Sequence, residues 1–87
     1  TIIAGTKSFN TTAQVVRGSG TLKDGVKVKA SVDNTDVIFV GGFSLTNRPD
    51  QGMPLEPGES CYISINNISV LYARAASGNQ SLHYLGS

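Results

Sequence analysis

The residues of this chain that could take part in catalysis are few and lie far apart in the sequence. His83 is its one histidine and Cys61 its one cysteine. A zinc site needs three or four histidine, cysteine or carboxylate ligands, so these two predict no metal centre. His83 lies in the alternating segment SLHYL, which is typical of a surface or interface position in a strand. We expect His83 at an interface and Cys61 as a small buried residue.

The carboxylates are also poorly placed for chemistry. Asp33 and Asp36 flank a short Asn-Thr segment, but the glycine and the terminal glutamate of a calcium loop are not in register. These two residues therefore predict an Asx-type turn. Glu56 and Glu59 are the only glutamates, and a pair three residues apart on a turn does not make a glycosidase site. The sequence predicts no catalytic, cofactor-binding or metal-binding residue, and no enzyme.

Composition narrows the class of partner. Among 87 residues, seven Lys and Arg face six Asp and Glu, a net charge of +1. Nucleic-acid binding needs a basic excess, so no nucleic acid is expected as a partner. The longest apolar run, Val37–Val40, is far too short to cross a bilayer, so no membrane is expected either. A chain this short buries only about 60–65% of its unfolded surface, which favours a homo-oligomer or a docked state.

The elements that would hold these residues are short strands. In GVKVKASVD (residues 25–33), Val26, Val28, Ala30 and Val32 alternate with polar residues. That pattern predicts a strand with one buried and one wet face.

Two further segments extend the pattern. SFNTTAQVV (residues 8–16) predicts one strand with Phe9 and Val15 on the same face. Asp36–Val40 is apolar on both sides and predicts a central strand, with alternation resuming at Phe43 and Leu45.

Glycine and proline mark the corners. Gly41-Gly42 predicts a bulge or tight bend after the central strand. In EPGES, Pro57 presets φ for the second position of a type II turn and Gly58 accepts the positive φ that follows. We expect Glu59 to cap a backbone N–H group there. Upstream of this turn, Leu55 should point inward with Met53 as its companion.

The predicted architecture is all-β: a small antiparallel sandwich or jelly-roll-like barrel of about 6–8 short strands with little or no helix. Residues 9–87 form its single domain. Residues 1–8 are either an N-terminal docking arm, with Ile2 and Ile3 as its apolar contacts, or an edge strand of the same domain. Tyr62 faces away from Cys61 and Ile63, which makes it a further candidate interface residue.

Three segments carry a resemblance to a known family: TLKDGVKVKASVDNTDVIFVGGFSLT (21–46), GMPLEPGESCYISI (52–65) and VLYARAASGNQSLHYLG (70–86). Together they resemble a recurrent small domain of bacteriophage virion proteins, found as head decoration proteins, head-fibre parts or other virion-attached modules. The shared outline is a lysine-bearing strand, an Asn-Thr turn, V-x-x-V-G-G, G-x-P-L-x-P-G-E-S and closing Y-A and Y-L strands.

The resemblance implies a non-enzymatic virion protein that is made in the cytoplasm of a bacterial host and docks on the capsid exterior. Its partner would be the major capsid protein or another virion protein, and a homo-oligomer, most often a trimer, would be the docking form. The alternatives are a head-fibre or tail-associated module and a cell-surface or carbohydrate-binding sandwich. The candidate interface residues are Ile2, Ile3, Tyr62 and His83.

Overall fold

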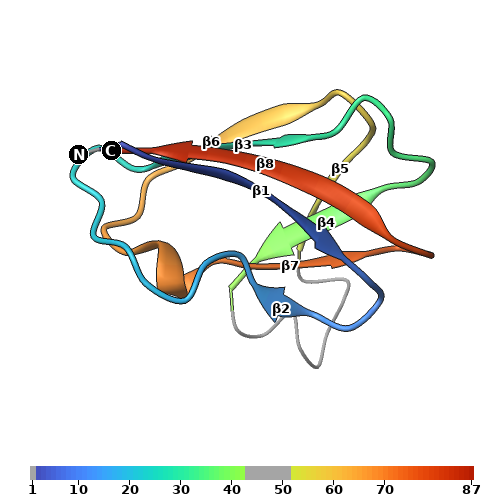
Figure 1. Cartoon of the computed structure of the whole chain (residues 1–87), viewed down its shortest axis with the longest axis horizontal. Coiled ribbons are helices and arrows are strands. Elements are labelled where there is room, and N and C mark those ends of the chain that lie inside the picture. The colour runs from blue at the N-terminus through green and yellow to red at the C-terminus, as the bar shows by residue number, and fades with distance from the viewer. Residues whose placement is uncertain (1, 43–51) are drawn as a thin grey trace.

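The computed structural model describes residues 2–42 and 52–87 and contains two four-stranded antiparallel sheets (Figure 1). Sheet A has the order β1-β8-β3-β6, with β1 (Ile3–Phe9), β8 (Gln80–Gly86), β3 (Val26–Ala30) and β6 (Ser60–Ile63). Sheet B has the order β2-β7-β4-β5, with β2 (Gln14–Val15), β7 (Tyr72–Ala75), β4 (Ile38–Gly41) and β5 (Met53–Leu55). The one helical element in the described ranges is the 3₁₀ turn η3 (Ile68–Val70). The predicted all-β class is confirmed.

The core lies between the two sheets and follows from the period-two alternation of the strands. Val26, Val28 and Ala30 of β3 are fully buried, while the two lysines between them are exposed. Ile38 and Val40 of β4 face them from sheet B. The central position predicted for residues 36–40 is confirmed, because β4 pairs with β7 on one side and β5 on the other.

The predicted strand over residues 8–16 is wrong, because the chain turns in its middle. Strand β1 ends at Phe9, and the Asn10 side chain accepts a hydrogen bond from the Thr12 N–H at 2.9 Å. This local turn releases the chain from sheet A, and β2 then joins sheet B beside β7. Residues on either side of Asn10 therefore belong to different sheets.

Two side chains expected to be inward lie at the surface. Val32 is 67% exposed because β3 ends at Ala30 and a turn follows, closed by the Asn34 N–H donating to the Ser31 carbonyl at 3.1 Å. Met53 is 56% exposed, whereas Leu55, two residues on, is buried as expected. The predictions for Phe43 and Leu45 lie outside the described residues.

The Pro57-Gly58 corner is built as predicted. Gly58 has φ +87°, and the Glu59 N–H donates to the Glu56 carbonyl at 2.9 Å, as in a type II turn. The Glu59 carboxylate accepts the Glu56 N–H at 2.8 Å, which is the expected cap. The corner carries the chain from sheet B to sheet A. At the Gly41-Gly42 pair, β4 ends and the chain bends.

Candidate functional site: the outer face and free edge of sheet A

The outer face of sheet A is organised as rows of side chains that cross all four strands. The strand register places Ala4 beside Leu85, Leu85 beside Lys27, and Lys27 beside Tyr62. The next row consists of Thr6, His83, Lys29 and Ser60. Directly opposed side chains on one face of a sheet lie close enough to interact. One row is therefore mainly apolar and the adjacent row polar and basic.

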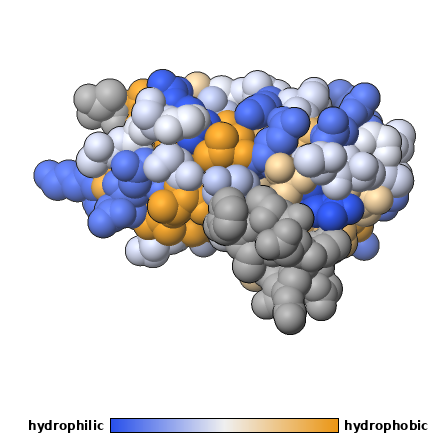
Figure 2. All heavy atoms as spheres, turned by 90° about the horizontal axis from the view of Figure 1, so that it is seen from below, coloured by the Kyte–Doolittle hydropathy of each residue, from blue (hydrophilic) through white to orange (hydrophobic). Residues whose placement is uncertain are grey.

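The apolar row ends in large exposed side chains. Tyr62 is 61% exposed and Leu85 55%, and Ile2, which precedes β1, is 74% exposed. Ile2, Leu85 and Tyr62 also line one shallow depression of about 230 Å³, together with the charged residues Lys27 and Asp24. Scattered apolar residues are ordinary on a protein surface, as the separate patches in Figure 2 illustrate. Three exposed apolar side chains that line one depression are a stronger indication of a contact surface than isolated ones.

Tyr62 owes its position to a glycine. A Cβ atom built on Gly25 would come within 2.6 Å of the Tyr62 hydroxyl and 2.5 Å of the Ile63 carbonyl. Gly25 also has φ +101°, a conformation that side chains disfavour. The tyrosine ring therefore rests over bare backbone at the start of β3, with the rest of its surface open to solvent.

The polar row has His83 at its centre. The His83 ring Nδ1 and the Thr6 Oγ1 form a hydrogen bond of 2.7 Å. Within residues 2–42 and 52–87, no three His, Cys, Asp or Glu side chains come together to hold a metal ion. Cys61 is half-buried, and burial raises the pKa of its thiol, which disfavours the reactive thiolate. The row is suited to hydrogen bonding and to charge pairing with a partner.

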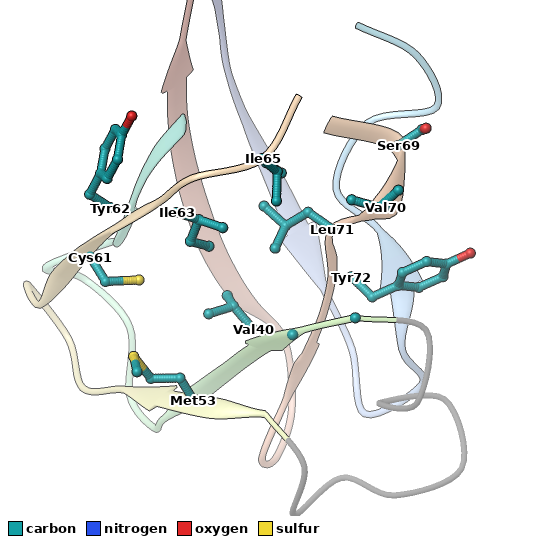
Figure 3. A pocket seen from close by; sticks show the side chains of 12 residues that line it. Val40, Met53, Cys61, Tyr62, Ile63, Ile65, Ser69, Val70, Leu71 and Tyr72 are labelled. Carbon is teal, nitrogen blue, oxygen red and sulfur yellow. The ribbon is translucent and has the colours of Figure 1, made fainter. Parts of the chain in front are cut away.

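A second feature adjoins this face across the edge strand β6. A groove of about 690 Å³ opens between the sheets on the side where β6 and β5 form their edges. In Figure 3, the side chains of Val40, Cys61, Ile63 and Ile65 point into the groove, while Tyr62 points away to the outer face. None of the twelve described lining residues is charged. An uncharged concave surface of this volume is typical of a binding site for an apolar group.

The structure brings three of the four predicted interface residues to one face. Ile2, Tyr62 and His83 all lie on the outer side of sheet A, although 81 positions separate the first from the last. Ile3 is the exception, since it begins β1, pairs with Gly86 and is only 8% exposed. Ile3 is a core residue in this fold, and residues 3–9 are an edge strand.

Two parts of the site were not predicted from the sequence. Leu85 lies two residues after His83 in the alternating strand β8, and this spacing is the sequence signal for its exposure on the same face. The sequence gives no signal for the groove, because Cys61, Ile63 and Ile65 alternate as core residues do. Only the assembled sheets show that this part of the core reaches the surface.

Comparison with known protein families, with curated proteins and with solved structures finds no match to this chain. In the described part of the chain, no helix is long and apolar enough to span a bilayer.

Proposed function

We propose that this chain is a non-enzymatic virion structural protein, a bacteriophage capsid decoration or cement protein. It docks through the outer face of sheet A on the major capsid protein or another virion protein at the capsid exterior. The observation that carries the proposal is the gathering of Ile2, Tyr62 and Leu85 in one depression beside a polar row. An apolar centre with a polar rim is the usual composition of a protein–protein interface.

The energetics of a small sandwich agree with this role. Apolar surface removed from water contributes about 25 cal/mol per Å², so burying these three side chains stabilises both the complex and the fold. Tyrosine is enriched among the residues that dominate binding energy, because its ring buries a large area with little loss of conformational entropy. Lys27, Lys29 and His83 lie on the same face and favour a partner surface with carboxylates around its apolar centre.

We take the kind of partner from the resemblance of the motif outline to virion modules, and the outer face of sheet A supports the position of the contact. A fibre or tail-associated module would use the same face on a different virion protein. A carbohydrate-binding module would use the exposed Tyr62 ring as a stacking platform. Each alternative is an outcome of the experiment below.

The first test is cryo-electron microscopy of the phage particles whose genome encodes this chain. The second is rebinding of the purified protein to particles from which it has been removed. We expect the chain at every equivalent lattice position on the head. Leu85→Asp should weaken rebinding at least tenfold, while Val32→Asp, a matched change at another exposed aliphatic residue, should rebind like wild type. Particles without the chain would refute the virion role. Copies on a tail or fibre would favour that alternative, and glycan binding lost in Tyr62→Ala would favour the carbohydrate module.

A further inference from the structure

The four sheet edges in the described part of the chain differ in how they are protected against pairing. Natural proteins block exposed edges with inward-pointing charges, prolines or very short strands. Edge strand β1 carries the inward-pointing Lys7, edge strand β5 contains Pro54, and β2 has only two residues. Edge strand β6 (Ser60–Ile63) has none of these protections: its residues are Ser, Cys, Tyr and Ile. An unprotected edge next to an apolar groove is a site for strand addition.

The register of β6 shows which of its backbone groups are free to pair. The Ala30 N–H donates to the Glu59 carbonyl at 2.9 Å, just beyond the last paired residues of β3 and β6. This makes it a position where the ladder is hydrogen-bonded, although the Glu59 N–H donates into the turn instead. Hydrogen-bonded pairs alternate along an antiparallel ladder, which places Cys61 opposite Val28 as the next hydrogen-bonded pair. The N–H and C=O groups of Tyr62 therefore point away from β3 toward the open edge, where no described strand lies.

We propose that β6 pairs antiparallel with β6 of a second copy of this chain, about a two-fold axis at Tyr62. The two sheets A then form one continuous eight-stranded sheet, in which the backbone of each Tyr62 exchanges hydrogen bonds with its counterpart. The side chains of Cys61 and Ile63 from each copy lie beside those of the other on the inner face. They extend over the mouth of the groove, where Met53 is 56% exposed.

Charge favours a second copy as the occupant. A two-fold axis places each residue near its own copy, so any charge on the edge would repel itself. Neither β6 nor the described lining of the groove contains a charged residue. A cyclic trimer would instead join β6 to a different edge of the next copy, and those edges carry Lys7, Pro54 or only two residues. The two-fold dimer therefore fits the edges better than the trimer expected from the resemblance. Ile2, which precedes β1, and Leu85, on β8, lie outside the edge strand of the axis residue Tyr62 and stay exposed in the dimer, so the dimer can dock by these side chains.

The experiment measures association of the whole chain, with reductant present and with Cys61→Ser as a check against disulfide linkage. Sedimentation equilibrium from about 1 µM to about 1 mM should show a species of twice the 9.1 kDa monomer mass. Hydrogen exchange should then show the Tyr62 N–H protected in the dimer and fast in the dilute monomer. The Cys61 and Ile63 N–H groups, which face β3, should be protected in both.

Tyr62→Pro is the most direct variant, because it removes an N–H group that the monomer does not use and proline is tolerated on such an edge. It should raise the dissociation constant roughly 30-fold or more, since two symmetric hydrogen bonds are lost. Tyr62→Lys keeps the backbone and places like charges at the axis, and it should dissociate the dimer even if the proline variant folds poorly. Tyr62→Phe is the matched control and should associate like wild type.

A chain that stays monomeric at 1 mM, that forms trimers, or that forms dimers with a freely exchanging Tyr62 N–H would overturn the proposal. Leu85→Asp separates this proposal from the virion role. Its dimer should be intact while its rebinding to particles is lost. Loss of dimerisation in Leu85→Asp would place the contact on the face instead of the edge.

Discussion

The two flanks of the sandwich, where the edges of sheets A and B come together, are closed in different ways. On the flank formed by β1 and β2, the Lys7 ammonium donates to the Val15 carbonyl at 2.8 Å and lies 5.4 Å from the centre of the Phe9 ring. Phe9 itself is 1% exposed. On the flank formed by β6 and β5, Cys61 and Ile63 are half-buried and line a groove.

The difference shows how one small core can serve both stability and binding. The β1–β2 flank is sealed by a charge and an aromatic ring, which also protect its edge. The β6–β5 flank leaves apolar side chains beside an unprotected strand. The 87 residues of this sequence form a small core, so each apolar side chain left in water removes a large share of its stabilising burial. We therefore expect another molecule to cover the open flank.

The largest expected effect comes from emptying the sealed flank. Phe9→Ala should lower the free energy of unfolding by about 3–5 kcal/mol, because it leaves a cavity in fully buried surroundings. The matched change on the other flank, Ile63→Ala, should lower it by about 1–2 kcal/mol, since its side chain is already partly in water. Urea unfolding followed by circular dichroism, at a concentration where the chain is monomeric, measures both. Equal losses would show that the two flanks do not differ.

The next effect concerns Gln80, which pairs with Phe9 at the end of the sealed flank and is 2% exposed. Its side-chain Oε1 accepts a hydrogen bond from the Thr35 N–H at 2.9 Å, and its side-chain Nε2 donates to the Ser77 backbone carbonyl at 2.8 Å. Gln80→Ala should cost about 1–2 kcal/mol, because the part-buried hydrogen bonds to the Thr35 N–H and the Ser77 carbonyl are lost.

The control for Gln80 is Gln14→Ala, an exposed glutamine, which should stay within about 0.5 kcal/mol of wild type. The measurement is the urea midpoint at constant slope. If the two variants unfold alike, the buried amide network does not stabilise this end of the molecule.

A smaller effect is expected from the lysine that seals the β1–β2 flank. Lys7→Met keeps the length of the side chain but removes the hydrogen bond to Val15 and the contact of the ammonium with Phe9. We expect a loss of about 1 kcal/mol in thermal or urea unfolding. Lys29→Met, on the exposed face, is the control and should be nearly neutral. Should Lys7→Met also self-associate more strongly than wild type, the protective role of Lys7 at its edge would be supported.

The smallest effect is electrostatic. The Ser77 hydroxyl donates to the Asp36 carboxylate at 2.6 Å and the Val37 N–H donates at 2.7 Å, and together they hold the pKa of Asp36 below its ordinary value of 3.8. A carboxyl whose pKa is lowered on folding stabilises the fold fully above its unfolded pKa. That contribution is lost as the pH falls below 3.8 through the folded pKa.

An NMR titration of the Asp36 carboxyl should therefore give a pKa below 3.8, and Ser77→Ala should raise it toward that value. Unfolding midpoints of the Ser77→Ala variant should accordingly depend less on pH at the acid end. A wild-type Asp36 that titrates at or above 3.8 would contradict this account.

Local patterns gave correct predictions wherever a short segment decides its own geometry. The alternation in β3, the Pro57-Gly58 turn and its Glu59 cap all depend on residues a few positions apart. The strand over residues 8–16 failed for the opposite reason. Its alternation was compatible with a single strand, and only the pairing of β2 with β7 shows that the chain changes sheets at Asn10.

The candidate site was only partly predictable. The outward direction of Tyr62 and His83 follows from alternation within each strand. Tyr62 and His83 lie on one face with Ile2 and Leu85 because of the strand order β1-β8-β3-β6. In this order the first and last strands of the chain pair with each other, and β8 also pairs with β3, which pairs with β6.

The amino-acid sequence by itself determined that this protein is an all-β chain of short strands, because period-two alternation and turn residues act over a few positions. The tertiary structure alone decided which strands are edges and where the core stays open, since pairing between distant segments sets both. Strand β6 shows the same alternation of apolar and polar residues as the interior strand β3. It is an edge strand because, among the described strands, it pairs with β3 alone.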